Sequence, residues 1–175
     1  MKIGLVRHFK VDLPYPGKIL ISADELRDWF SVYETAGLLI SEVNTGGIKW
    51  KYCFSSPLIR ARETAVSVFG NEYITARELS ELDILPLLNS KWKLPLFAWA
   101  LIMKRKSESD SEITVKFRDN LNDFLDKIIS DYNENTLLVC HGFVMMHLRK
   151  ELRRRGYKGP YFNSPANAKV YIFEK

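Results

Sequence analysis

Three short apolar runs limit the folds that this chain can adopt, because each run ends in polar residues and a helical pattern follows it. The runs are Ile3 to Val6, Tyr52 to Phe54 and Thr136 to Cys140, and they are typical of strands buried on both faces of a sheet. Their alternation with helices predicts an α/β fold, with a mainly parallel central sheet flanked by helices on both faces. In such a sheet, ligands bind beyond the carboxyl ends of the strands.

A capping box marks the start of one of these helices. Ser22 is followed three residues later by Glu25, and apolar residues then recur at helical spacing from Leu26 to Tyr33. Gly37 is expected to end this helix. At the other end of the chain, the alternating residues of Val170 to Phe173 predict an edge strand.

The bulk properties predict one domain, spanning residues 1–175. A chain of this length buries a sizeable core, and 46% hydrophobic with 27% charged residues is typical of a soluble globular protein. The two cysteines, Cys53 and Cys140, lie in apolar runs and are expected to be reduced and buried. The apolar run at Ile3 to Val6 is too short for a signal peptide or a membrane span, so we expect a cytoplasmic protein without membrane contact.

The net charge of +5 favours an anionic partner, which is a phosphorylated metabolite, a nucleic acid or an acidic membrane surface. Arg149 to Arg155 is the most cationic run, and it has two interpretations. A solvated helix face ending in a basic turn is favoured over a polyanion site, since cations suit the C-terminal end of a helix. Without a nucleic-acid motif beside the run, we expect no nucleic-acid partner.

Two histidines follow the apolar runs directly and are expected at the same edge of the sheet. His8 follows Arg7 after the first run, and His141 follows the last, while Arg60 and Arg62 come soon after the second. Guanidinium groups offer paired donors to phosphate oxygens. Nearby positive charges also keep an imidazole neutral and therefore nucleophilic. The sequence thus predicts a phosphate site in which His8 attacks phosphorus.

Three ordered motifs resemble the histidine phosphatase superfamily, which includes phosphoglycerate mutases and many small-molecule phosphatases. LVRH at Leu5 to His8 is similar to its N-terminal signature, and SSPLIRARETA at Ser55 to Ala65 is similar to its second phosphate-binding motif. LLVCHG at Leu137 to Gly142 resembles the segment with its second histidine. The resemblance spans most of the chain and implies a phosphoglycerate mutase-like fold.

The resemblance also implies a role for each matching residue. His8 is expected to carry the phosphoryl group as phosphohistidine, while Arg7, Arg60 and His141 are expected to bind the phosphoryl oxygens. These four residues would form the core of the site.

The segment LSELD at residues 79–83 is similar to the family segment that supplies the proton donor. The donor aligns with Glu81, and Asp83 is the reserve candidate. Glu81 would protonate the leaving oxygen and then activate the water that hydrolyses phosphohistidine. We expect no metal or other cofactor, because the arginines supply the positive charge.

These roles predict a phosphomonoesterase that acts on a small phosphorylated metabolite. Two alternatives stay open: phosphoryl transfer of the phosphoglycerate mutase type, and a non-catalytic protein that binds phosphate or a phosphopeptide. Phe9 occupies a position where the family usually has glycine, and its side chain is expected to narrow or reshape the pocket mouth. Mutases of the family are generally longer, which favours hydrolysis. The substrate and the oligomeric state stay open.

The segment around residues 84–112 is a predicted lid or cap. Its apolar part, Trp92 to Met103, fits a core helix or packed loop, or alternatively a substrate lid or partner surface. Lys104 to Ser111 is predicted to be a polar loop.

Two residues near the motifs are left out of the predicted site. His147 lies six residues after His141 on the same helix, which turns it away from the first turn, so a packing or surface role is expected. Arg62 is expected to be a solvated helix residue, with a contact at the pocket rim as the alternative.

Overall fold

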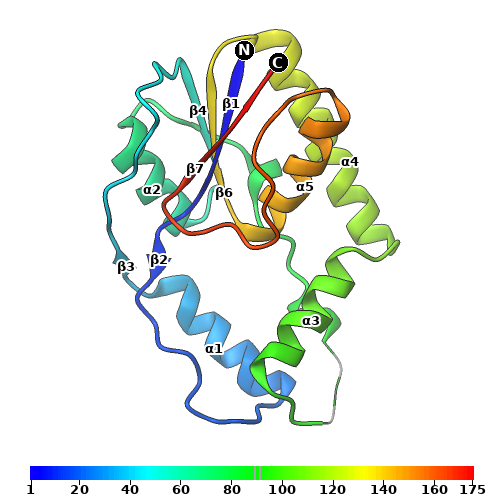
Figure 1. Cartoon of the computed structure of the whole chain (residues 1–175). Coiled ribbons are helices and arrows are strands. Elements are labelled where there is room, and N and C mark those ends of the chain that lie inside the picture. The colour runs from blue at the N-terminus through cyan, green and yellow to red at the C-terminus, as the bar shows by residue number, and fades with distance from the viewer. Residues whose placement is uncertain (89, 91) are drawn as a thin grey trace.

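A five-stranded sheet forms the centre of the computed structural model, which describes residues 1–88, 90 and 92–175 (Figure 1). The strand order is β5-β4-β6-β1-β7. The parallel strands are β1 (Lys2–Arg7), β4 (Tyr52–Ser55), β5 (Ile74–Thr75) and β6 (Thr136–Cys140), and β7 (Val170–Glu174) is an antiparallel edge strand. The predicted sheet and its C-terminal edge strand are confirmed.

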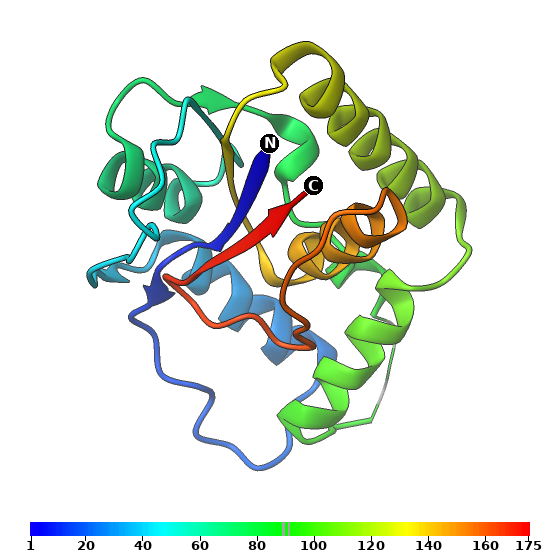
Figure 2. The same ribbon diagram turned by 45° about the horizontal axis from the view of Figure 1, so that its top comes forward.

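Helices cover both faces of this sheet (Figures 1 and 2). The views place α2 (Ile59–Phe69) on one face, and α4 (Glu112–Lys127) with α5 (Gly142–Arg154) on the other. The shorter elements are β2 (Lys10–Val11) paired with β3 (Leu38–Leu39), the 3-10 turns η1 (Arg77–Leu79) and η2 (Leu85–Leu87), and the π-helical turn η3 (Ile128–Tyr132) that follows α4.

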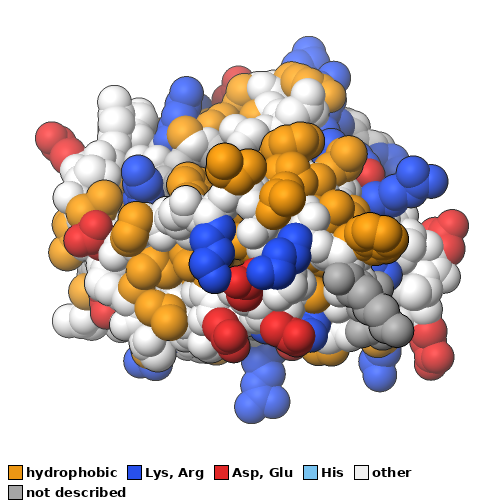
Figure 3. Space-filling model, turned by 90° about the horizontal axis from the view of Figure 1, so that it is seen from below, with side chains coloured by type: hydrophobic (Ala, Val, Ile, Leu, Met, Phe, Trp, Pro, Cys, Tyr) orange, Lys and Arg blue, Asp and Glu red, His pale blue; other side chains and the backbone are white. Residues whose placement is uncertain are grey.

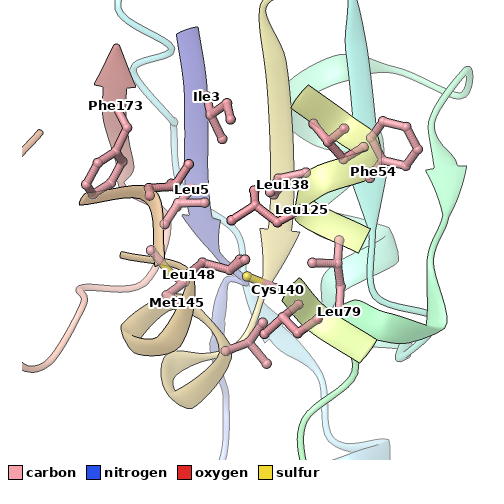
Figure 4. Packing of buried hydrophobic residues seen from close by; sticks show 14 of the residues in the cluster. Ile3, Leu5, Phe54, Leu79, Leu125, Leu138, Cys140, Met145, Leu148 and Phe173 are labelled. Carbon is pink, nitrogen blue, oxygen red and sulfur yellow. The ribbon is translucent and has the colours of Figure 1, made fainter. Parts of the chain in front are cut away.

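Successive side chains of β6 pack on opposite faces of the sheet, as in any pleated strand. Leu138 packs with Leu5, Leu125 and Met145 in the cluster beneath α4 and α5, which Figure 4 shows from close by. Leu137 and Val139 belong to the opposite cluster, which includes alanines of α2. Every residue of β6 is buried. This two-sided burial explains why the strand reads as a continuous apolar run.

The pairing of β1 with β6 fixes the position of the two histidines. Arg7 pairs with Cys140 at the end of the parallel ladder, and the backbone N–H of His8 donates to the Cys140 carbonyl at 3.1 Å. His8 and His141 therefore leave the sheet side by side. Both cysteines are free and buried, as expected.

The helices α1 (Ala23–Thr35) and α3 (Leu96–Ser107) form an outer layer beyond the carboxyl ends of the strands (Figure 1). Leu26 of α1 and Trp99 of α3 share a small buried cluster. The indole N–H of Trp99 also donates to the Ile21 carbonyl at 2.9 Å, which ties α3 to the chain just before α1.

The core-helix interpretation of Trp92 to Met103 is correct for Trp99, but Phe97 and Leu101 are exposed. Figure 3 shows hydrophobic side chains among charged ones on this end of the molecule. The loop predicted at Lys104 to Ser111 is wrong over its first half, because α3 continues to Ser107 and its last turn carries basic residues that suit the helix dipole. Residues 89 and 91 of the predicted lid lie outside the described residues, and lid movement stays a prediction.

The prediction that Arg149 to Arg155 form a solvated helix face is wrong for Arg149. Arg149 is buried, donates to the Phe162 carbonyl, and lies 4.2 Å from the ring centroid of Tyr161. The segment that follows α5 folds back over this helix and covers the guanidinium group. Arg153 and Arg154 are exposed, as expected. Among the described residues, none of the helices combines the length and apolar character that crossing a membrane requires.

The capping box predicted at α1 is present and allows a stability test. The Ser22 hydroxyl accepts from the Glu25 N–H at 3.2 Å, and the Glu25 carboxylate accepts from the Ser22 N–H at 2.8 Å. We expect Ser22→Ala to lower the free energy of unfolding by about 1 kcal/mol, because a helix N–H loses its acceptor. Urea denaturation measures this change. Ser31→Ala, on the exposed surface of the same helix, is the control, and an equal loss in both variants would contradict the assignment.

Candidate active site

Five predicted residues come together beyond the carboxyl edge of the sheet. Arg7 is the last residue of β1 and His8 follows it, while His141 lies between β6 and α5. Arg60 lies in the first turn of α2, and Glu81 lies in the loop after η1. The strand-to-helix connections thus bring two histidines, two guanidinium groups and one carboxylate to the same place, as the sequence predicts.

The ring of His8 is held in one tautomer. Its Nδ1 lies 2.6 Å from the Phe9 carbonyl oxygen, which accepts and therefore requires a proton on Nδ1. The lone pair is left on Nε2. The backbone around the ring is fixed from two sides, since Asn167 donates to the His8 carbonyl at 2.7 Å and Thr64 accepts from the Phe9 N–H at 2.9 Å. His8 therefore presents a nucleophilic nitrogen in a fixed orientation.

The expectation that Phe9 narrows the pocket mouth is wrong. Its side chain is completely buried, and only its peptide group takes part in the site. The carbonyl that orients His8 is a backbone group, so the change from glycine leaves this contact intact.

His141 is held in the tautomer that complements His8. Its Nε2 lies 2.9 Å from the Ser56 hydroxyl oxygen, which already accepts from the Leu58 N–H at 3.3 Å. We assign the proton of His141 to Nδ1, which faces Glu81 Oε2 at 3.7 Å, and the Ser56 hydroxyl then donates to Nε2. With the two ring centroids 5.1 Å apart, His141 offers a donor beside the nucleophile.

Three buried nitrogens of the site lack a hydrogen-bond partner within the described part of the chain. They are Nε of Arg7, Nε of Arg60 and Nδ1 of His141. Buried donors without acceptors are costly, so native structures rarely keep them without a reason. The guanidinium group of Arg7 also lies beside the N-terminus of α5, since a Cβ added to Gly142 would lie 3.6 Å from Cζ of Arg7, and helix N–H groups at this end favour an anion. Donors on three residues of one cluster are the groups that bind the oxygens of a phosphoryl group.

Glu81 is the carboxylate that reaches this cluster. Its Oε2 lies 3.4 Å from Nη2 of Arg60 and 3.7 Å from Nδ1 of His141. Loss of hydration raises the pKa of Glu81, and the positive charges of Arg60 and Arg7 only partly oppose this effect. A raised pKa suits a group that must give up a proton near neutral pH. The reserve candidate Asp83 is exposed and accepts from the Leu85 N–H at 3.2 Å instead.

Both histidines of the site are neutral near neutral pH. Burial lowers the pKa of His8 to about 3; the hydrogen bond to Phe9 opposes this, and the charges of Arg60 and Arg7 add to it. Burial also lowers the pKa of His141 well below its ordinary value, with smaller effects from His8 and the two arginines. The lone pair of His8 is therefore available.

Arg62 and His147 lie outside the site. Arg62 is exposed and its Nε donates to the Tyr73 hydroxyl at 3.1 Å, in agreement with a solvated helix residue, and the pocket-rim alternative stays a prediction. Nε2 of His147 lies 3.2 Å from the side-chain oxygen of Asn122, in agreement with a packing role.

The structure adds residues that the sequence analysis missed. Ser56 and Thr64 both belong to the motif SSPLIRARETA, so their hydroxyl groups were visible as candidates. The ring centroid of Tyr33 lies 5.3 Å from Cζ of Arg60, and Asn167 holds the His8 carbonyl. No sequence signal connects these last two residues to the motifs. Among the described residues, no cluster of three or more histidine, cysteine or carboxylate side chains is suited to a metal ion.

The unpartnered donors predict tight binding of inorganic phosphate. We expect Arg60→Met to weaken phosphate binding at least about tenfold, because a charge-assisted hydrogen bond is lost. Isothermal titration calorimetry measures the dissociation constant. Arg62→Met is the matched control, two residues away on the same helix but exposed. Equal weakening in both variants would mean that net charge, rather than this site, binds phosphate.

The buried neutral histidine predicts a loss of stability in acid. The pKa of His8 is about 3 in the folded chain against 6.5 ordinarily, so the unfolded chain takes up the proton first as the pH falls. The free energy of unfolding is therefore unaffected by His8 above pH 6.5, and it falls as the pH decreases from 6.5 towards 3. Between about pH 7.5 and pH 5, one such histidine costs about 2 kcal/mol. Urea denaturation measures the free energy of unfolding at both pH values. We expect its fall to be smaller by this amount in His8→Asn than in the wild type, and the same fall in both proteins would contradict the effect of burial.

Solved structures with similar folds include two phosphatases. Phosphoserine phosphatase from Entamoeba histolytica, in complex with 3-phosphoglyceric acid, has a TM-score of 0.53 at 14% identity, covering 98% of this chain and 89% of that one. Mycobacterial glucosyl-3-phosphoglycerate phosphatase, in complex with VO3, has a TM-score of 0.59 at 16% identity, covering 98% and 91%. These likenesses confirm the predicted phosphoglycerate mutase-like fold. A comparison with curated protein sequences finds no significant match.

A family comparison agrees with the motifs. The sequence model of the histidine phosphatase superfamily (branch 1) matches residues 34–175, which include Arg60, Glu81 and His141. The match begins after β1, which ends at Arg7 directly before His8, and the pairing of β1 with β6 brings both residues to the matched part of the chain. Because the match covers most of the chain, this protein belongs to the histidine phosphatase superfamily.

Proposed function

We propose that the protein is a phosphomonoesterase that hydrolyses a small phosphorylated metabolite through a covalent phosphohistidine on His8. One observation carries the proposal: buried nitrogens of Arg7, Arg60 and His141 that have no hydrogen-bond partner among the described residues lie in the same cluster as a histidine whose lone pair is free on Nε2. Membership of the histidine phosphatase superfamily and the phosphatases among the similar folds support phosphatase activity.

In the first step, Nε2 of His8 attacks phosphorus in line with the leaving oxygen. A nitrogen–phosphorus bond forms while the phosphorus–oxygen bond to the alcohol breaks. Glu81, whose pKa is raised by loss of hydration, gives its proton to the departing oxygen in the proposed step. The guanidinium groups of Arg7 and Arg60 and the Nδ1–H of His141 stabilise the negative charge on the other phosphoryl oxygens.

In the second step, water replaces the imidazole. The ionised Glu81 takes a proton from water, whose oxygen attacks phosphorus as the nitrogen–phosphorus bond breaks. The lone pair returns to Nε2 of His8, and Glu81 is protonated again for the next cycle. The guanidinium groups supply the positive charge that a metal ion supplies in other phosphatases, so the proposed reaction proceeds without a metal.

The burial of Phe9 also bears on the choice between catalysis and binding alone. Phe9 and the unusual loop that follows it, Lys10 to Leu13, are the two grounds for the alternative of a non-catalytic phosphate-binding protein. Phe9 lies in the interior, so the steric ground is lost and the loop remains as the other.

Hydrolysis of an aryl phosphate in the presence of a chelator tests the proposal. We expect turnover in the wild type, no turnover in His8→Ala, and a rate lowered about 100-fold or more in Glu81→Gln for substrates with a poor leaving group. Released phosphate is the readout. His147→Gln is the control, since this histidine packs against Asn122 outside the site and its loss should leave the rate unchanged.

Two results would overturn the proposal. Turnover in His8→Ala equal to that of the wild type would exclude this residue as the nucleophile. Complete loss of turnover in chelator, restored by a divalent metal ion, would exclude the metal-free mechanism.

A further inference from the structure

Three aromatic side chains form a row that leads from the molecular surface to Arg60. This aromatic row consists of Tyr15, Trp29 and Tyr33. The rings of Tyr15 and Trp29 are stacked with centroids 6.0 Å apart, and those of Trp29 and Tyr33 are 5.2 Å apart. The ring of Tyr33 lies 5.3 Å from Cζ of Arg60. The row therefore ends at a guanidinium group of the phosphate site.

The row is held in place before any ligand binds. Trp29 and Tyr33 are one helical turn apart on α1, which brings their rings together on one face. The indole N–H of Trp29 donates to the Pro14 carbonyl at 3.0 Å and thereby holds the neighbouring Tyr15 against the helix. A fixed row loses little conformational entropy when a ligand binds to it.

The row lies at the margin of the hydrophobic core, since the ring centroid of Phe30 lies 5.0 Å from that of Trp29 and 5.9 Å from that of Tyr33. The buried cluster between α1 and α3 includes Phe30, but Tyr15, Trp29 and Tyr33 are not among its members. Tyr15 is 73% exposed, and the other two rings are half-buried. Although two of the rings pack against Phe30, all three aromatic side chains keep part of their surface in contact with solvent beside a charged site.

Electrostatics also connects the row to the site. Burial raises the pKa of the Tyr33 hydroxyl, while the charges of Arg60 and Arg7 oppose the shift and that of Glu81 adds to it. The same guanidinium group that lies 5.3 Å from the Tyr33 ring thus also acts on its hydroxyl. Figure 1 shows α1, which carries Trp29 and Tyr33, beyond the carboxyl ends of β1 and β6.

The two parts of a phosphomonoester differ in what they need from such a site. The phosphoryl group needs cations and N–H donors, which Arg7, Arg60 and His141 offer. Aromatic rings offer faces and edges that pack against another ring. A leaving group that extends from Arg60 along α1 meets Tyr33 first and Trp29 next.

We infer that the aromatic row is a leaving-group subsite, and that the substrate is a phosphomonoester of an alcohol or phenol that carries an aromatic ring. This inference rests on the proposed function and deepens it. It assigns substrate specificity to α1 and to Tyr15 in the segment before it, away from the reacting atoms.

The test compares an aromatic with an aliphatic substrate across variants. We expect Trp29→Leu to lower kcat/KM for 1-naphthyl phosphate about tenfold, the loss typical of a stacking contact, and to change that for glycerol phosphate less than about twofold. The difference in leaving-group reactivity cancels, because each variant is compared with the wild type on the same substrate. Tyr15→Leu, at an exposed position, should shift the preference in the same direction without affecting folding.

Two controls complete the design. Tyr33→Phe keeps the ring and should keep the preference for the aromatic substrate. Phe97→Leu removes an exposed aromatic ring of α3 and should change neither rate. Equal slowing of both substrates in Trp29→Leu and Tyr15→Leu would overturn the subsite.

Binding separates failure of the subsite from failure of the proposed function. In a His8→Ala background, calorimetry measures the affinity for 1-naphthyl phosphate and glycerol phosphate without turnover. We expect tighter binding of the naphthyl ester, and a loss of this preference when Trp29→Leu is added. If the wild type hydrolyses neither ester, the proposed function fails while the ring preference is still measured. Equal affinity for both esters in His8→Ala would overturn the subsite.

Discussion

The parallel pairing of β1 with β6 is the constraint on which the candidate active site depends. Arg7 and Cys140 are partners at the end of the ladder, and the N–H of His8 continues the pattern by donating to the Cys140 carbonyl. A shift of one residue in this register would turn the side chains that follow to the opposite face. The core on both sides of β6 prevents such a shift, so the packing of Leu138 on one face and Val139 on the other also fixes the geometry of the site.

Burying the ionisable groups of the site lowers the stability of the folded chain. Burial keeps both imidazoles neutral, and it leaves donors of Arg7, Arg60 and His141 without acceptors in the described part of the chain. A phosphoryl group supplies the acceptors, so binding recovers interactions that folding alone leaves unmade. Such a loss of stability is expected at a site that has evolved to bind a ligand.

Sequence reasoning succeeds here where chemistry follows a buried strand directly. The runs before His8 and His141 predict that the two rings meet, and the spacing within SSPLIRARETA predicts the position of Arg60. Contacts between segments without local periodicity could not be foreseen. The ring of Tyr33 reaches Arg60 because α1 crosses the end of the sheet, and Arg149 is buried because a later segment folds over α5. Both depend on tertiary arrangement, which local pattern does not encode.

A rapid-quench experiment on Glu81→Gln tests the central claim, a phosphohistidine on His8, most directly. An aryl phosphate with a good leaving group needs no acid for the first step, whereas hydrolysis of the phosphoenzyme still needs Glu81 as a base. The account predicts a burst of one phenol per active site, and a phosphoryl group that mass spectrometry locates on the peptide containing His8. A phosphoryl group on another residue, or turnover without any covalent intermediate under these conditions, would contradict it.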